Sequence, residues 1–309
     1  LHTGDKQTLE DLYDGVKRYL SLWKIEENGL VKFRAGEWQW GDWGDNIDIV
    51  LIHNILYYHA IKGMYNSALV LNKISDAEHY NDWMTKFRKS FNETYWNGTA
   101  YRHPDYTGAT DDRVQALAAV IGLPEQSMYP AILHVLKNEF HASPYMERYV
   151  MQALFEIGYP EYAVERYKKR FEEMVNNEEY STLWELWFKS GPTINHAWSG
   201  GGLIMMYQYI CGIVPIKAGY KTFEVIPRPV FNKASANVET VAGTIKTEFE
   251  KLETVFKLNV QVPAGTTCIL GIENNYEEVA LNGKIIWKKG ECVSNKNILN
   301  IDVKDDRYL

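Results

Sequence analysis

The chain has 309 residues, a formal net charge of −7 at pH 7 and a pI near 5.7, and its Lys and Arg residues form no block, so the composition argues against a nucleic-acid partner. No apolar run approaches the roughly 20 residues that a membrane-spanning helix needs. Aromatic residues make up 14% of the chain, including 10 Trp and 21 Tyr, which fits either a carbohydrate-binding protein or a large aromatic core.

Residues 1–212 have the apolar spacing of helices, and we expect them to form one helical domain. The expected helices cover residues 8–24, 48–63, 64–73, 76–93, 110–121, 127–139, 144–157, 160–176 and 199–211. Gly, Pro and Asn residues mark the breaks between them. Short loops of this kind make consecutive helices antiparallel neighbours.

From residue 213 onward the apolar period changes to two, which predicts strands. The strand-like stretches include residues 223–226, 243–250, 254–262, 267–272, 285–287 and 298–301. Asn282-Gly283 between two such stretches is a strong signal for a two-residue hairpin turn. We therefore expect residues 213–309 to form an antiparallel β-sandwich domain, whose surface charges look solvating.

A loop at residues 36–46 holds three Trp and three acidic residues, and Gly41 and Gly44 prevent it from forming a plain helix. Exposed Trp rings need something to stack on, which can be each other, a core or a ligand, and we expect Asp42 with Trp43 to line a pocket. Asn46 is expected to cap the helix that begins near Ile47.

Residues 180–202 form the most informative stretch, because Glu185 stands between Trp184 and Trp187. Asn195, His196 and Trp198 follow, and then a run of glycines. Sugar rings stack on indoles, sugar hydroxyls need amide or imidazole partners, and a carboxylate can activate water. The alternative is a buried aromatic loop whose acid is paired or solvated.

Two further expectations follow from the acids. A Glu185 carboxylate held between indoles and near another carboxylate should have a raised pKa, because burial and like charge both disfavour ionisation. Asp111 and Asp112 suit the start of a helix, where Arg113 could pair with either of them. No His or Cys spacing indicates a metal site, and we expect neither a metal nor another cofactor.

Five motifs in the same order resemble those of glycoside hydrolase family 78, the α-L-rhamnosidases. They are Gly41-Asp-Trp43, Ala116-Leu-Ala-Ala-Val-Ile-Gly-Leu123, Thr182-Leu-Trp-Glu185, Asn195-His196 and Gly212-Ile-Val-Pro215. The order of the motifs matches over most of the chain. The resemblance implies an (α/α)₆ toroid followed by a β-domain, and removal of terminal α-L-rhamnose-like sugars from oligosaccharides, polysaccharides or glycosides.

The resemblance also implies an inverting mechanism, in which one acid protonates the glycosidic oxygen and another activates water. Glu185 would be the water-activating base, with His196 hydrogen-bonding the sugar or the water. Asp42 and Trp43 would help to hold the sugar ring. The expected sugar-binding set also includes Trp40, Trp184, Asn195 and Trp198, which lie in the same two loops.

One family motif has no match. The family's general acid lies in an Asp-Glu-Arg-x-Gly-Trp segment before the Gly-Asp-Trp loop, and this sequence shows no such segment. The expected helices also number fewer than the twelve of a closed six-hairpin toroid. We therefore expect a toroid that is incomplete at its N-terminal end, with the acid supplied by a further N-terminal part of the same protein. Glu37, Asp42 or Asp45 could take the role instead.

Two other functions stay open at this point. The chain could belong to another (α/α)₆ glycosidase or to a polysaccharide lyase, in which Asn195 and His196 act with a tyrosine. It could also be a sugar-binding or structural fragment without catalysis, because the acid motif is missing. A polysaccharide-degrading role would favour a periplasmic or extracellular location.

Overall fold

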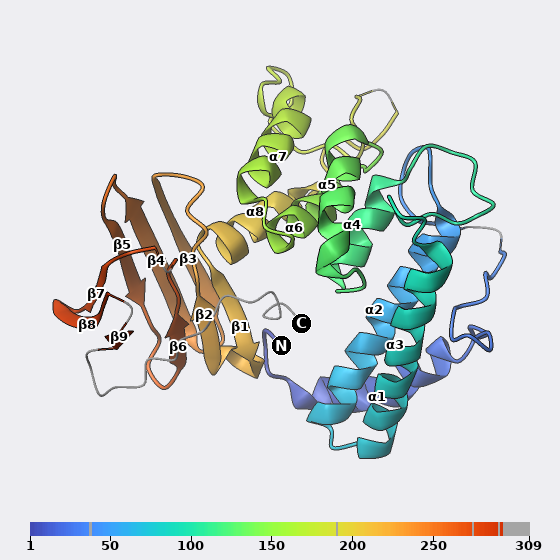
Figure 1. The fold of residues 1–309 in the computed structure, drawn as a ribbon, viewed down its shortest axis with the longest axis horizontal. Coiled ribbons are helices and arrows are strands. Elements are labelled where there is room, and N and C mark those ends of the chain that lie inside the picture. The colour runs from blue at the N-terminus through green and yellow to red at the C-terminus, as the bar shows by residue number, and fades with distance from the viewer. Residues whose placement is uncertain (37–38, 190, 274, 290, 293–309) are drawn as a thin grey trace. The chain divides into compact units, whose positions relative to one another are not determined.

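The computed structural model describes residues 1–36, 39–189, 191–273, 275–289 and 291–292 (Figure 1). Contacts between Cα atoms divide the chain into two compact units. One unit is Gly4–Met206, and the other contains the residues from Tyr207 onward together with Leu1–Thr3. The first is helical and the second is built from strands, as the change of apolar period predicts.

The helical unit contains eight α-helices among its described residues. They are α1 (Lys6–Leu20), α2 (Ile49–Val70), α3 (Ile74–Tyr95), α4 (Asp112–Val120), α5 (Tyr129–Asn138), α6 (Glu147–Glu156), α7 (Pro160–Val175) and α8 (Gly201–Met205). Short 3₁₀ turns precede α5 (η1, Gln126–Met128) and α8 (η2, Ala197–Gly200), and a π-helical turn, η3 (Met206–Ile210), follows α8. Where two helices were expected over residues 48–73 there is one, because Ile61 and Met64 on either side of Gly63 are both buried and hold the helix continuous.

The loops of this unit alternate between the two ends of the helices, and the alternation positions the site. Residues 71–73, 121–128 and 157–159 join α2 to α3, α4 to α5 and α6 to α7. Residues 21–48, 96–111 and 139–146 precede α2, α4 and α6, and a further loop follows α7. Because consecutive helices joined by short loops are antiparallel, as α2 and α3 are in Figure 1, alternate loops fall at the same end of the helices. The loops before α2, α4 and α6 and the loop after α7 therefore share one end.

Helix α4 lies in the interior of the helical unit. All eight of its residues from Asp112 to Ala119 are buried, although the first two, Asp112 and Arg113, are charged. Charged side chains are rarely buried in this way unless they are paired. The buried start of α4 therefore demands ionic partners from the neighbouring long loops.

The strand unit contains three three-stranded sheets in the described residues, with the strand orders β1-β2-β6, β3-β4-β5 and β7-β8-β9. The strands are β1 (Ile213–Lys217), β2 (Thr222–Val225), β3 (Lys233–Thr240), β4 (Gly243–Lys251), β5 (Phe256–Gln261), β6 (Thr267–Leu270), β7 (Glu278–Leu281), β8 (Lys284–Lys288) and β9 (Glu291–Cys292). Ile213, Phe223 and Val225 from the first sheet pack against Ile245 of β4, which gives the two-sheet core of a sandwich.

Two details of this unit bear on the sequence predictions. The hairpin at Asn282-Gly283 is confirmed, because β7 and β8 pair antiparallel and both turn residues have positive φ, 49° and 76°. The sheet is not antiparallel throughout, because β2 and β6 pair in parallel after a long connection. The strand expected at residues 298–301 lies outside the described residues.

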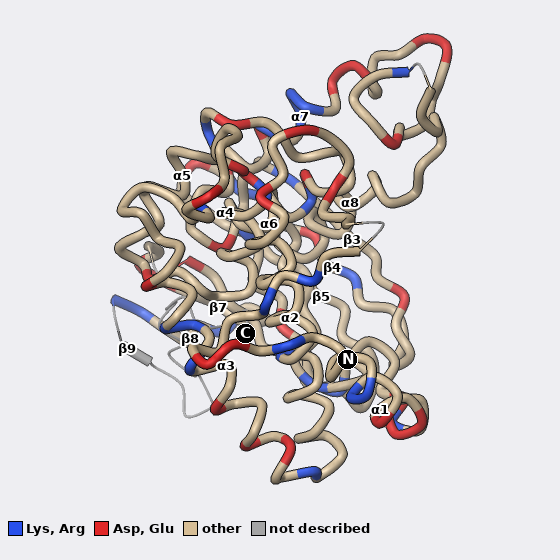
Figure 2. Tube along the Cα trace, turned by 90° about the vertical axis from the view of Figure 1, so that its right-hand side faces the viewer, with Lys and Arg blue, Asp and Glu red and all other residues tan. Residues whose placement is uncertain are grey.

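Acidic and basic residues are interspersed along the helices (Figure 2). Among the described residues, no helix has the length and apolar character needed to span a membrane.

Candidate active site

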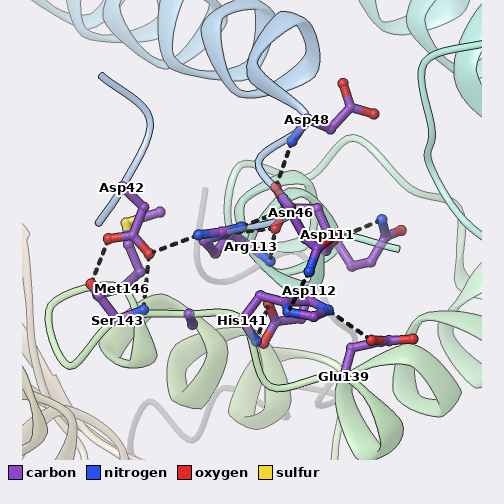
Figure 3. A network of polar contacts seen from close by, with 12 residues as sticks. Asp42, Asn46, Asp48, Asp111, Asp112, Arg113, Glu139, His141, Ser143 and Met146 are labelled. Carbon is purple, nitrogen blue, oxygen red and sulfur yellow. Dashed lines mark hydrogen bonds and ion pairs between the residues drawn. The ribbon is translucent and has the colours of Figure 1, made fainter. Parts of the chain in front are cut away.

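Three segments of the helical unit meet around one buried arginine (Figure 3). Arg113, in the first turn of α4, donates from Nη1 to Oδ2 of Asp42 over 3.2 Å. Ser143, in the loop between α5 and α6, donates to the same carboxylate from its backbone N–H at 2.9 Å and from its hydroxyl at 2.5 Å. Asp42 therefore ties the loop before α2 to the loop before α6, with the start of α4 between them.

The rest of the Arg113 guanidinium holds the same region together. Its Nε donates to Oδ1 of Asp111 at 2.7 Å, and its Nη2 donates to the backbone carbonyls of Asp45 and Asn46 at 2.7 and 2.8 Å. Asp111 also caps α4 and accepts the backbone N–H of Asp48 at 2.9 Å. The expectation that Arg113 pairs with an acid of its own segment is confirmed.

Asp42 departs from its expected place among the sugar contacts. The residue is 5% exposed, and its carboxylate is engaged by Ser143 and Arg113. Burial raises the pKa of Asp42, and the Ser143 hydrogen bonds and the Arg113 charge oppose that rise. Burial alone would lower the pKa of Arg113, but the attraction of Asp111 raises it above its ordinary value. Asp42 therefore fixes the loop, rather than offering a free carboxylate to a sugar or a glycosidic oxygen.

Asn46 also has a different role from the expected one. It has a φ of 54°, and its side-chain oxygen accepts the backbone N–H of Ala109 at 3.0 Å. Helix α2 begins later, at Ile49, with Asp48 at its N-cap. The prediction that Asn46 caps this helix is wrong, because its amide instead joins two long loops.

A second buried network of ion pairs involves Asp112, the residue that follows Asp111 at the start of α4. Arg166 of α7 donates to Asp112 at 2.8 Å and to Glu147 of α6 at 2.5 Å. Arg170, one turn further along α7, lies 3.6 Å from Glu147. Because Asp111 and Asp112 are consecutive, the two arginine networks join α4, α6 and α7 to the loops at one end of the helices.

The loop after α7 is folded back on itself like a short hairpin. The N–H of Glu185 donates to the carbonyl of Thr193 at 2.9 Å, and the N–H of His196 donates to the carbonyl of Leu183 at 2.8 Å. The ring of Trp184 is 0% exposed and packs on Phe171 and Met174. Trp184 is therefore a core anchor of this loop.

The side chain of Glu185, next to the buried Trp184, is only partly buried. Its Oε2 accepts the backbone N–H of Thr193 at 3.0 Å. This hydrogen bond lowers the pKa of Glu185, and the nearby His196 acts in the same direction. The expected rise of the Glu185 pKa is wrong, because the carboxylate is hydrogen-bonded in its ionised form instead of being enclosed by indoles.

The Asn195-His196 segment lies close to Glu185. Asn195 and Trp198 are exposed, the latter by 58% of its surface. Nε2 of His196 is buried and has no hydrogen-bond partner among the described residues. Ser199 is buried and donates from its hydroxyl to the carbonyl of Trp184 at 2.6 Å, which anchors the segment. His196 therefore has one ring nitrogen without a partner in the described part of the chain.

The two Trp-containing loops are joined by a row of rings that the sequence did not predict. Trp43 meets Trp40 with ring centroids 6.2 Å apart, and Trp40 meets Tyr145 at 5.9 Å. Tyr145 meets Trp198 at 5.3 Å, and Trp198 meets His196 at 5.6 Å. The structure therefore brings together four of the expected sugar contacts: Trp40, Trp43, His196 and Trp198.

The remaining candidates are the two alternative acids. The Asp45 side chain is exposed, and its backbone carbonyl accepts from Arg113. Glu37 lies outside the described residues. The geometry thus adds no support for a general acid at either position.

A hollow of about 770 Å³ runs along α7 and is lined in part by Phe140, Arg170, Trp184 and Trp187. Glu185 does not appear among the described residues that line it. Arg170 lies 4.0 Å from the centroid of the Trp187 ring, whose Nε1 donates to the carbonyl of Ala142 at 2.8 Å. We take the ring row and Glu185 as the candidate site, because they present the aromatic rings and the hydrogen-bonded carboxylate that the sequence singled out.

Sequence reasoning missed Ser143 and Tyr145. Nothing in the local pattern indicates that the Ser143 hydroxyl binds a carboxylate 101 residues away. The usable signal was the order of the helices, because consecutive antiparallel helices place alternate loops at the same end. It places the loop containing Tyr145 at the same end as both Trp-containing loops.

Comparison with family models finds two consecutive matches. Residues 1–210 match the bacterial alpha-L-rhamnosidase 6 hairpin glycosidase domain. Residues 212–284 match the bacterial alpha-L-rhamnosidase C-terminal domain.

Two curated relatives are named alpha-L-rhamnosidase. The one from Formosa agariphila is 25% identical over 308 residues, with 89% of this chain and 32% of the relative covered. The one from Streptomyces avermitilis is 24% identical over 307 residues, with 89% and 28% covered. The chain therefore spans about a third of the length of these relatives.

Solved structures show the same fold. An alpha-L-rhamnosidase from Dictyoglumus thermophilum aligns with a TM-score of 0.78 at 22% identity, over 93% of this chain and 35% of that one. The Streptomyces avermitilis alpha-L-rhamnosidase complexed with L-rhamnose aligns with a TM-score of 0.72 at 21% identity, over 89% and 28%. The fold is thus a helical six-hairpin domain followed by a small, mostly antiparallel sheet domain.

Proposed function

The chain belongs to the family of bacterial α-L-rhamnosidases with a six-hairpin glycosidase domain, and from that premise we propose that it forms part of a glycoside hydrolase acting on terminal α-L-rhamnose-like sugars. Oligosaccharides, polysaccharides and small glycosides all present such sugars. In this proposal residues 1–212 form the catalytic region and residues 213–309 a separate β-domain.

The observation that carries the proposal is the state of Glu185. Its carboxylate is partly exposed, and the Thr193 N–H lowers its pKa, so it is ionised at neutral pH. An ionised carboxylate is what a general base needs in order to take a proton from water. We propose that Glu185 activates the water that attacks the anomeric carbon.

The neighbouring residues support the same role. Nε2 of His196 has no partner in the described part of the chain, so it can exchange a hydrogen bond with a sugar hydroxyl or with the attacking water. Trp198, Trp40 and Trp43 supply ring faces for the C–H surface of a sugar. Asn195 is exposed in the same segment and can add an amide contact.

An inverting reaction also needs a general acid, about 6.5–9.5 Å from the base. We propose that this acid comes from a part of the protein outside the 309 residues, because the chain spans only about a third of its relatives. Support for Asp42 is weak, since its carboxylate is buried and bound to Arg113 and Ser143.

The test uses the whole protein that carries this chain and a panel of aryl glycosides, together with a uronate polymer. The proposal predicts release of the aryl group from the α-L-rhamnoside, and NMR of the first product should show β-L-rhamnose, the inverted anomer. Cleavage of the uronate polymer with formation of an unsaturated sugar would instead identify a lyase. Initial release of the α-anomer would contradict the inverting mechanism.

A further inference from the structure

Tyr145 occupies the centre of the ring row, between the two Trp-containing loops. Its ring centroid lies 5.9 Å from that of Trp40 and 5.3 Å from that of Trp198, and both pairs are tilted. Trp40 and Trp198 are more than 150 residues apart in sequence, and each reaches the row from its own loop. Without the Tyr145 ring, the described contacts would leave two separate aromatic pairs.

The position of Tyr145 is fixed from both sides. Two residues before it, Ser143 holds Asp42, which belongs to the loop that carries Trp40 and Trp43. The backbone N–H of Met146, directly after it, donates to the Ser143 hydroxyl at 3.3 Å. These bonds make the Tyr145 ring part of a preorganised surface, so little side-chain entropy is lost when a ligand stacks on it.

The row is also accessible. Trp40, Trp43, Tyr145 and His196 are each partly exposed, and Trp198 is 58% exposed. The Tyr145 hydroxyl lies 3.4 Å from that of Tyr149, so a partner for the polar end of the side chain is already present. What Tyr145 offers to a ligand is therefore mainly its ring.

We infer that Tyr145 is a sugar-binding residue whose ring joins the two Trp-containing loops into one continuous stacking surface for a neutral pyranose. This inference rests on the proposed function, because it takes the ligand to be a terminal rhamnose-like sugar. The axial C–H groups of a pyranose form an apolar face that packs on such rings. The row begins at His196, which belongs to the same hairpin-like loop as Glu185.

The inference separates the ring of Tyr145 from its hydroxyl. Tyr145→Phe keeps the ring and should bind L-rhamnose within about twofold of the unsubstituted protein. Tyr145→Leu keeps apolar volume but removes the π face, and should weaken binding by about 3- to 10-fold, the range that one aromatic contact represents. KM for the aryl α-L-rhamnoside should rise by the same factor, with kcat within about twofold.

Tyr57 provides a matched control on α2. It is also a partly buried tyrosine between two tryptophans, with ring centroids 5.9 Å from Trp23 and 5.5 Å from Trp83. Tyr57→Leu should lower the unfolding temperature at least as much as Tyr145→Leu and leave sugar binding unchanged. Equal losses of binding in the two variants would show that Tyr145 acts only through stability.

The experiment measures L-rhamnose binding by calorimetry and aryl-glycoside kinetics for the whole protein and these variants. Unchanged binding in a folded Tyr145→Leu variant would overturn the inference, as would an equal loss in Tyr145→Phe. If Tyr145→Leu does not fold, the inference is tested by fluorine NMR of the unsubstituted protein labelled with 3-fluorotyrosine. The Tyr145 signal, assigned by its loss in Tyr145→Phe, should shift with L-rhamnose, and an unshifted signal would refute the inference.

The same measurements distinguish failure of the inference from failure of the proposed function. If the unsubstituted protein cleaves the α-L-rhamnoside and Tyr145→Leu does so with an unchanged KM, only the role of Tyr145 fails. If it cleaves no rhamnoside but binds another neutral sugar of the panel, weakened by Tyr145→Leu, only the rhamnosidase function fails. Absence of binding to every sugar of the panel would overturn both.

Discussion

Replacing Arg113 with Met tests whether the buried ion network holds the site together. Arg113 and the Asp42 side chain are both 0% exposed, and the substitution removes the bonds from the guanidinium to Asp42, Asp111 and two backbone carbonyls. Two carboxylates would then be buried without their cation. Removing one partner of a buried ion pair costs about 3–5 kcal/mol of unfolding free energy.

The expected loss of unfolding free energy corresponds to a fall in the melting temperature. A unit of about 200 residues loses about 2–4 °C per kcal/mol, so the thermal transition of the helical unit should fall by about 6–20 °C. The assay is thermal and urea unfolding followed by far-UV circular dichroism and tryptophan fluorescence. Lys89→Met is the matched control, since Lys89 pairs with Glu93 at 3.9 Å with 76% and 65% of the side chains exposed. Its effect should stay within about 0.5 kcal/mol.

A pH series adds a second check on the same substitution. Burial raises the pKa of Asp42 and of Asp111, so the folded state holds protons more readily than the unfolded chain. Arg113 opposes that rise, and its loss raises both folded pKa values further. The stability deficit of Arg113→Met should therefore be full at about pH 7 and shrink toward about pH 5, as the carboxyls become neutral. A deficit below about 1 kcal/mol, or one that does not change with pH, would refute the reasoning.

Two further predictions concern the loop after α7. Trp184→Ala should destabilise the helical unit by about 3–5 kcal/mol in urea unfolding, because the ring is 0% exposed, and a loss below about 1 kcal/mol would contradict its role as an anchor. The Thr193 N–H lowers the pKa of Glu185, so the base stays ionised until the pH falls below its ordinary value of 4.5. The acidic limb of kcat/KM that belongs to Glu185 should therefore lie below pH 4.5, because kcat/KM reports the pKa values of the free protein. An acidic limb above that pH that moves in Glu185→Asp would contradict the lowered pKa.

Local patterns predicted the helices and most of the strands, because periodicity and turn residues are local signals. The hairpin at Asn282-Gly283 is an example in which two residues determine a turn and its register. The merged helix α2 shows the limit of such signals. Gly63 reads as a break, but the buried residues around it keep the helix continuous.

The site was less predictable, because its contacts join distant residues. Asp42 reads as an acid beside Trp residues, and its partners Arg113 and Ser143 are 71 and 101 residues away. Trp184 and Glu185 are neighbours in sequence, but the ring is buried against Phe171 and Met174, whereas the carboxylate is partly exposed. A sequence motif identifies the types of residue at the site. The burial of each side chain depends on which loops meet at the site.

The central claim is that Glu185 activates water, and its most direct test is the turnover of Glu185→Gln in the whole protein. Glu179→Gln is the matched control, because Glu179 is exposed at the start of the same loop. The account predicts that Glu185→Gln loses at least about 100-fold in kcat while L-rhamnose binding and the unfolding temperature stay near those of Glu179→Gln. Turnover of Glu185→Gln equal to that of the control would contradict the account.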